Sequence, residues 1–318
     1  MTDAALSGVI PVVSTPFSDK DEIDVGVLGA EVDWLVSCGV DGLAVAMVSE
    51  VLRLTDSERR RRAELVASAA AGRVPVVATV GAQTTKETVS LALHAQSVGA
   101  AAVMAIPPLL VELPDEEIFD FYRCVLDCVD LPLVVQDASG YLGRPLSLQV
   151  CVRLVDTFGP VRVQFKPEAS PIGPRLSALL SATAGRARVF EGTGGVALVD
   201  SYRRGVVGSM PGPEVPWAVV ALWRALGRGD WATVGAIHGP LAALVSLQTS
   251  LDSFIAVEKY LLVRQGIFVG SRRRRPNAYE LDRETAIELD RLLALLQEAV
   301  SAGTTEEPAP KGSVIPAT

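Results

Sequence analysis

The sequence predicts an α/β fold, a (β/α)8 TIM barrel with additional C-terminal helices. Short, apolar, β-branched runs alternate with helical patterns from residue 9 to about residue 228, and there are eight such runs. Each run is apolar throughout, as expected for parallel strands that have helices on one side and a packed barrel interior on the other. Eight consecutive strand–helix units favour a closed barrel over an open, doubly wound sheet.

The expected strands occupy, in order, residues 9–14, 42–48, 75–80, 101–106, 132–137, 161–166, 187–192 and 205–210. Thr55 and Glu58 have the spacing of a capping box, and Thr84 and Glu87 repeat that spacing. Pro114 opens a further helix. These signals predict that helices follow the second, third and fourth strands.

Two segments, 230–266 and 282–300, have helical patterns beyond the eighth strand. We therefore expect the barrel over residues 1–229 and a C-terminal helical extension, packed on the barrel, over residues 230–302. The remainder, 303–318, is rich in Pro, Gly, Thr and Ala, a composition typical of a disordered tail.

The composition narrows the possible partners. A net charge of −8 argues against nucleic acid and anionic membranes. No apolar run approaches the ~20 residues that span a bilayer, and the first residues lack the basic region of a signal peptide. None of the four cysteines forms a CxxC pair, which favours reduced thiols. We expect a cytoplasmic protein with a small-molecule substrate.

Lys166 is the first candidate catalytic residue. Of the 29 Lys and Arg residues only five are lysines, and Lys166 is the one that ends an apolar strand. A lysine desolvated at a barrel mouth loses its proton more easily, which is what a Schiff-base amine requires. The alternative is a structural lysine paired with a carboxylate at a strand end.

Side-chain alternation along the sixth strand places Arg162, Gln164 and Lys166 on one face, which we expect to point into the barrel. If the extended backbone persists past Pro167, Glu168 lies on the same side. A carboxylate within reach of an imine is a candidate general acid/base. The alternatives for Glu168 are an ion pair with Lys166 and an exposed loop acid.

Active sites of such barrels lie at the carboxyl ends of the strands. There the sequence offers Ser14, Val48, Ser49, Gln136 and Asp137, which we interpret as candidate substrate-binding residues. No cluster of His, Cys, Asp and Glu has metal-ligand spacing, and no phosphate-binding P-loop or dinucleotide motif occurs. We expect neither a metal nor an organic cofactor. Gly192–Gly195 could bind a phosphate, although a tight strand-to-helix turn explains them equally well.

Several segments together carry a resemblance to a known family. They are STPF (14–17), SE (49–50), LTDSERR (54–60), GRVPVVATVGAQTT (72–85), GAAAVMAIPP (99–108), LPLVVQDAS (131–139), FK (165–166) and RRGVVGSMPG (203–212). Over roughly residues 8–300 the chain resembles the dihydrodipicolinate synthase / N-acetylneuraminate lyase family of class I aldolases and dehydratases. The resemblance implies that Lys166 is the Schiff-base lysine and that the protein is a homotetramer or homodimer.

The chain also departs from that family. Met47 and Val48 replace two threonines that help to hold the keto acid's carboxylate, and Gln136 replaces the tyrosine at the end of strand five. Tyr141 occupies the place of the arginine that dihydrodipicolinate synthases use for a second carboxylate. These differences argue against that synthase activity.

The QDA segment on strand five and the K-x-E segment on strand six are similar to those of the 2-keto-3-deoxy sugar acid dehydratases. This resemblance implies that Glu168 takes over acid/base work, supported by Ser14, while backbone amides near Val48 and Ser49 hold the substrate's carboxylate. Gln136 would then orient the chain. The alternatives are a pyruvate-releasing or pyruvate-condensing aldolase, and a non-catalytic keto-acid-binding barrel.

Overall fold

The computed structural model describes residues 5–140 and 143–305. Its strands are β1 (Gly8–Val9), β2 (Leu43–Ala44), β3 (Val76–Thr79), β4 (Ala102–Ala105), β5 (Leu133–Asp137), β6 (Val163–Pro167), β7 (Arg188–Glu191) and β8 (Gly208–Ser209). Its helices are α1 (Val25–Ser37), α2 (Asp56–Ala70), α3 (Thr85–Ser97), α4 (Asp115–Cys128), α5 (Leu148–Arg162), α6 (Ile172–Ala182), α7 (Leu198–Arg204), α8 (Pro216–Arg228), α9 (Trp231–Ser246), α10 (Leu251–Arg264) and α11 (Arg283–Thr305), with 3-10 turns η1 (Met47–Ser49) and η2 (Val51–Arg53).

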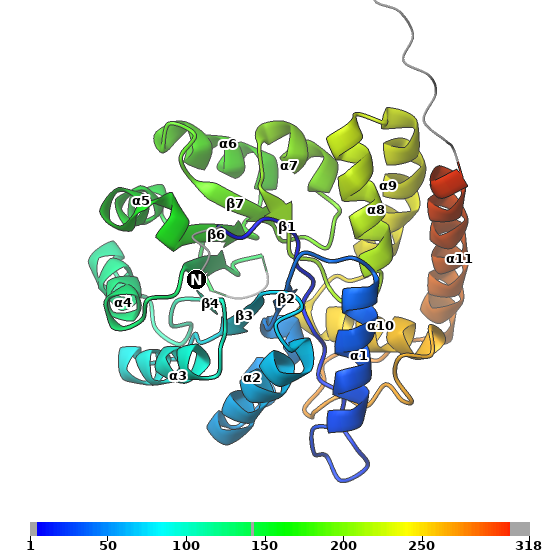
Figure 1. Cartoon of the computed structure of the whole chain (residues 1–318), viewed down its shortest axis with the longest axis horizontal. Coiled ribbons are helices and arrows are strands. Elements are labelled where there is room, and N and C mark those ends of the chain that lie inside the picture. Colours follow the sequence, from blue (N-terminus) through cyan, green and yellow to red (C-terminus); the bar gives the residue numbers. More distant parts are fainter. Residues whose placement is uncertain (1–4, 141–142, 306–318) are drawn as a thin grey trace, which may run out of the picture.

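The strands form one parallel sheet in the order β1-β8-β7-β6-β5-β4-β3-β2. The two ends of this sheet meet, because Val12 bridges to Ala44 and the Val13 amide donates to the Ala44 carbonyl oxygen at 2.8 Å. The sheet is therefore a closed barrel, with the helices around it (Figure 1). The predicted (β/α)8 barrel with C-terminal helices is confirmed.

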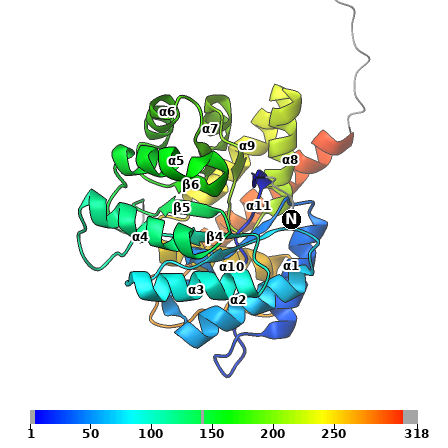
Figure 2. The same ribbon diagram turned by 60° about the vertical axis from the view of Figure 1, so that its left-hand side comes forward.

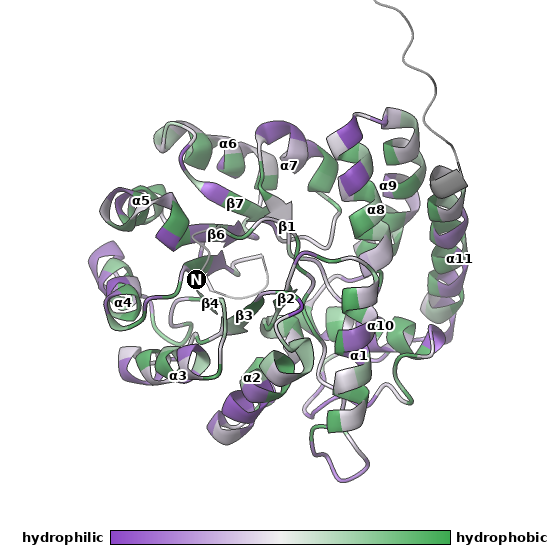
Figure 3. Cartoon of the chain, in the orientation of Figure 1, coloured by the Kyte–Doolittle hydropathy of each residue, from purple (hydrophilic) through white to green (hydrophobic). Residues whose placement is uncertain are grey.

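Side-chain alternation gives the barrel two apolar layers. Small and large apolar side chains fill the interior, among them Ala44, Ala102, Met104 and Phe190. The outward side chains of the strands pack against the helices instead. Helix α4 shows the corresponding division, with apolar residues toward the strands and an acidic first turn, as its two colours indicate (Figure 3). The interior is thus packed, and polar strand residues are accommodated at its mouth.

The helix start signals read from the sequence are present. Thr55 caps α2 reciprocally, since its hydroxyl accepts from the Glu58 amide at 3.3 Å and the Glu58 carboxylate accepts from the Thr55 amide at 2.8 Å. The Thr84 hydroxyl accepts from the Glu87 amide at 3.2 Å and caps α3. Pro114 is the N-cap of α4.

Strand six begins later than the sequence indicated. Residues up to Arg162 belong to α5, so the strand, with its alternating side chains, starts at Val163. The Arg162 guanidinium donates to the carbonyl oxygens of Leu126 and Val129, at 2.8 and 2.9 Å, and these precede β5. The expectation that Arg162 points into the barrel is therefore wrong.

Beyond the eighth unit, α9 packs on α8 and α11 packs on both, so that the three helices lie side by side (Figures 1 and 2). Helix α10 instead contacts η1, at the carboxyl end of β2. Helix α11 reaches Thr305, inside the segment expected to be a tail, and residues 306–318 of that segment lie outside the described residues. Across residues 5–140 and 143–305, none of the helices is long and apolar enough to cross a membrane.

Candidate active site

Lys166 and Glu168 lie together at the barrel mouth. The Glu168 amide donates to the Asp137 carbonyl oxygen at 2.8 Å, so the pairing of β5 and β6 continues past Pro167. Glu168 consequently has the same orientation as Lys166, and the lysine Nζ donates to Glu168 Oε1 at 2.9 Å. Both residues are buried, with 4% and 6% of their surfaces exposed. The sequence therefore predicted the side of the strand correctly for both residues.

Gln136 completes this group from the neighbouring strand. It is the register partner of Lys166 in the β5–β6 ladder, and its Nε2 donates to Glu168 Oε2 at 2.8 Å. The Glu168 carboxylate is thus held between an ammonium group and an amide. Burial raises the pKa of Glu168, the nearby Glu191 adds to that rise, and Lys166 and Gln136 offset part of it. A buried carboxyl group with a raised pKa, in contact with an amine, is well suited to exchange protons with it.

A glycine directly after β7 makes room for this pair. A Cβ added at Gly192 would lie 2.9 Å from Glu168 Cγ and 3.0 Å from Lys166 Cε, distances that a side chain could not keep. Gly194 and Gly195 have φ values of +68° and +101°, in the region that favours glycine. A tight turn accounts for these last two glycines, as the sequence allowed.

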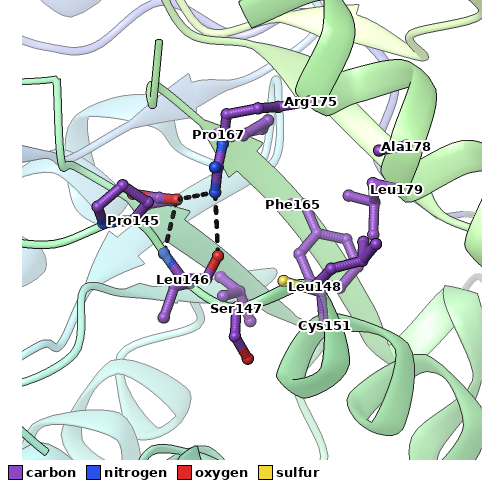
Figure 4. A pocket seen from close by; sticks show the side chains of 12 residues that line it. Pro145, Leu146, Ser147, Leu148, Cys151, Phe165, Pro167, Arg175, Ala178 and Leu179 are labelled. Carbon is purple, nitrogen blue, oxygen red and sulfur yellow. Dashed lines mark hydrogen bonds and ion pairs between the residues drawn. The ribbon is translucent and has the colours of Figure 1, made fainter. Parts of the chain in front are cut away.

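Asp137 does not join the group, in contrast to the prediction. It follows Gln136 directly in the strand, so its side chain points to the outer face. Its carboxylate accepts from the Ser139 and Leu146 amides at 3.1 and 3.0 Å, and the Arg175 guanidinium lies 3.8 Å away. Asp137 lines a pocket on the outer side of β5 and β6, and Figure 4 shows Leu146 and Arg175 in that pocket. Asp137 therefore orders the loop after β5 instead of facing the barrel mouth.

The serines have backbone partners. The Ser49 hydroxyl donates to the Val13 carbonyl oxygen at 2.6 Å, and the Ser49 amide donates to the Ala46 carbonyl oxygen at 3.0 Å. The hydroxyl holds η1 against the segment that follows β1, and the amide closes the η1 turn, so neither is free to donate to a ligand. Ser14 is fully buried, and its amide donates to Glu31 Oε1 at 2.6 Å. Neither serine is among the residues that line the pocket at the mouth.

Strands β5 and β6, the segments that follow β1, β2, β6, β7 and β8, and helix α10 line that pocket. The lining residues are Val12, Ala46, Met47, Val48, Gln136, Lys166, Glu168, Gly192, Gly194, Met210, Pro211, Gly212, Leu251, Phe254 and Glu258. Val48 and Gln136 thus have the placement that the sequence indicated. The contribution of α10 was missed, because its helical pattern gives no sign that the helix reaches the mouth. An acid within the apolar run IAVEKYLL, residues 255–262, was the available signal.

A second buried set of charges lies behind the mouth, beneath the ends of β1 and β2. We call Glu31, Glu50, Arg62 and Lys259 the β1–β2 charge cluster. The Lys259 Nζ donates to Glu50 Oε1 and, at 2.6 Å, to the Arg272 carbonyl oxygen. The Arg62 guanidinium donates to the carbonyl oxygens of Val13 and Ser14 at 2.6 and 2.9 Å. None of the four lines the pocket.

The sequence of this chain is similar to those of known proteins. A sequence model of the Dihydrodipicolinate synthetase family matches residues 5–295. The chain is 30% identical over 287 residues to L-2-keto-3-deoxyarabonate dehydratase of Azospirillum brasilense, covering 89% of this chain and 92% of the relative. It is 32% identical over 251 residues to a 4-hydroxy-tetrahydrodipicolinate synthase of Thermomicrobium roseum, covering 77% and 82%.

Among solved structures, similarity extends to YagE, a prophage protein of the dihydrodipicolinic acid synthase family from E. coli K12, in complex with pyruvate. The two structures superpose with a TM-score of 0.82 at 26% identity, over 92% of this chain and 99% of YagE.

Proposed function

Because the chain belongs to the dihydrodipicolinate synthetase family, whose named relatives are lyases, we propose that it is a class I lyase that forms a Schiff base between Lys166 and a 2-keto acid. The preferred reaction is dehydration of a 2-keto-3-deoxy sugar acid. The hydrogen-bonded group of Lys166, Glu168 and Gln136 supports this proposal above all, since it puts an acid/base carboxyl directly on the amine.

In the first step the amine must lose a proton before it attacks the substrate. Glu168 Oε1 is the acceptor at 2.9 Å. Neutral Lys166 then adds to the C2 carbonyl, and the carbinolamine loses its hydroxyl as water by taking the proton back from Glu168. The carboxylate is thereby regenerated next to an iminium ion, and these steps use no metal or cofactor.

In the second step the iminium ion makes C3 acidic because it accepts the electron pair of the C3–H bond. Glu168 removes that proton and transfers it to the C4 hydroxyl, which leaves as water. The backbone at Met47 and Val48 is the proposed place for the C1 carboxylate, since both residues line the pocket. Gln136 keeps Glu168 oriented throughout.

Two alternatives use the same pocket. The synthase relative favours pyruvate condensation, for which the same imine would serve, and retro-aldol cleavage would release pyruvate from the sugar acid. We expect no useful condensation of pyruvate with aspartate semialdehyde, because Gln136 replaces the family's tyrosine at the end of β5. Tyr141, which the sequence places where an arginine would bind a second carboxylate, lies outside the described residues.

The test is product analysis by NMR with a 2-keto-3-deoxypentonate as substrate. Dehydration yields one product that has lost water, whereas retro-aldol cleavage yields pyruvate and a two-carbon aldehyde. Aspartate semialdehyde with pyruvate is the comparison reaction, and efficient cyclic diacid formation would contradict the proposal. A protein that consumes none of these and forms no adduct with borohydride would instead be a non-catalytic keto-acid-binding barrel.

We also propose that the protein assembles as a homotetramer or homodimer. The loop between β4 and α4 supports this, because it presents Leu110 and Val111 with 82% and 59% of their surfaces exposed. Exposed apolar side chains that adjoin one another are typical of contact surfaces. Light scattering of the purified chain measures the mass, and a monomer at micromolar concentration would contradict the assembly.

A further inference from the structure

The proposed mechanism leaves one carboxyl group of the pocket unused. Glu258 lies on α10 and lines the same pocket as Lys166 and Glu168. Its side chain is fully buried, and neither carboxyl oxygen has a hydrogen-bond partner among the residues that the structure describes. A buried polar group without partners is costly, so such groups are rare unless a ligand or water supplies the missing bond.

A second carboxyl group stands next to it. Glu214, in the loop between β8 and α8, accepts from Gln248 Nε2 at 2.9 Å with one oxygen, while its other oxygen is buried and unpartnered within the described chain. A Cβ added at Gly212 would lie 2.2 Å from Glu214 Oε2 and 2.6 Å from Glu258 Oε1. The two oxygens therefore face the same point beside the pocket.

Two close, buried carboxyl groups do not both ionise. Burial raises the pKa of Glu258 well above its ordinary value, and Glu214, Glu31 and Glu50 add to that rise, while Lys259 offsets part of it. Burial and these neighbours therefore favour the protonated form of Glu258. In this form it both donates and accepts a hydrogen bond, unlike a carboxylate, which only accepts.

We propose that protonated Glu258 hydrogen-bonds a hydroxyl group on the substrate chain beyond the imine carbon, so that α10 supplies a specificity-determining residue. The inference rests on the proposed function, because it requires a polyhydroxylated keto acid attached to Lys166. A hydroxyl group matches the neutral acid, since each can donate and accept. The substrate's C1 carboxylate is a poor partner, because Glu214 and Glu168 already make this part of the protein acidic.

Two substitutions test this role. Glu258→Gln keeps one donor and one acceptor in nearly the same shape, whereas Glu258→Leu keeps the bulk and removes both. For consumption of a 2-keto-3-deoxypentonate, we expect Glu258→Leu to lower kcat/KM about 10- to 100-fold, the loss that one or two buried hydrogen bonds produce. Glu258→Gln should stay within a few fold of the unsubstituted protein.

Pyruvate provides the matched control because it has no chain hydroxyl. Borohydride trapping of pyruvate on Lys166 should have the same half-saturating concentration in all three proteins. Equal losses for pyruvate and the sugar acid would overturn the inference, since Glu258 would then act on the lysine or on the carboxylate. Unchanged kcat/KM in Glu258→Leu would overturn it as well. Absence of any trapped adduct in the unsubstituted protein would instead overturn the proposed function itself.

Discussion

Two lysine–glutamate pairs are buried in this barrel, and they have different surroundings. Lys166 and Glu168 line the pocket at the mouth, with Gln136 as a third partner. Lys259 and Glu50 are enclosed instead, since Lys259 also donates to the Arg272 carbonyl oxygen and its Nζ lies 4.7 Å from the centre of the Phe17 ring.

The enclosed pair has further backbone contacts. Glu50 accepts from the Arg274 amide at 2.8 Å, so the pair links α10 and the segment after it to the end of β2. Burial alone therefore does not distinguish a reactive lysine from a structural one, because both lysines are nearly inaccessible. Access to a pocket distinguishes them, and the first three predictions below test this difference.

The largest difference between the pairs should appear on removing each lysine. Lys166→Met removes the nucleophile, so we expect turnover and borohydride trapping to fall to background while the protein still folds. Lys259→Met should keep trapping in its folded fraction. Intact-protein and peptide mass spectrometry after treatment with pyruvate and borohydride measures both. Adduct on the Lys259 peptide would reverse the assignment of the two pairs.

The second largest difference between the pairs should appear on removing the carboxylate of Glu168. Glu168→Gln keeps the shape but removes the acid/base group, and such groups contribute roughly 10²–10⁴-fold in rate. We expect kcat to fall on that scale while the Lys166 imine still forms and is trapped, but more slowly, together with slower solvent deuterium exchange at C3 of a bound keto acid. Turnover and exchange at the unsubstituted rates would show that Glu168 is structural, like Glu50.

For the enclosed pair the effect should be on stability. Lys259→Met leaves Glu50 without its cation, and breaking a buried pair from one side costs about 3–5 kcal/mol of unfolding free energy. Urea unfolding of Lys259→Met, Glu50→Gln and the double variant measures the loss of unfolding free energy and the coupling energy between the two residues. We expect the double variant to recover part of the loss. If Lys166→Met destabilised the protein as much, the two pairs would not differ in this respect.

The last prediction concerns the pH dependence of stability, which changes little over any single pH unit. Burial raises the pKa of Glu31 to about 8, with the Ser14 amide, Arg62 and Lys259 offsetting part of the rise. The folded chain therefore keeps a proton on Glu31 that the unfolded chain loses above pH 4.5. As a result, the free energy of unfolding should fall as the pH rises from 4.5 to about 8. The slope is at most about 1.4 kcal/mol per pH unit for one group. Chemical unfolding across this pH range should show that the free energy of unfolding of Glu31→Gln depends less steeply on pH than that of the unsubstituted protein.

The sequence predicted the barrel and the Lys166–Glu168 pair because both depend on local patterns. Strand alternation sets which side chains share a face, and it held from Val163 to Glu168. Asp137 was misassigned although the same rule applied, since a strand end was treated as a site without regard to the face it presents. Arg162 was misassigned because strand boundaries are not fixed by composition.

Glu258 could not be predicted in the same way. Its position at the mouth depends on how α10 packs against η1, which involves residues about 200 positions apart in the chain. The same is true of Lys259, whose partner Glu50 lies at the end of β2. Sequence patterns indicate that such residues belong to a helix, but tertiary packing decides what the helix faces.

Glu258 and Lys259 are adjacent on α10, but Glu258 lines the pocket whereas Lys259 pairs with Glu50. Successive side chains of an α-helix differ by about 100° around its axis. The ion pair of Lys259 with Glu50 therefore fixes the rotation of α10, and with it the direction in which Glu258 enters the pocket. Weakening the anchor would leave the apolar packing of α10 alone to hold that rotation. Discrimination among hydroxylated substrates would then decline at temperatures where the barrel is still folded and Lys166 still reacts.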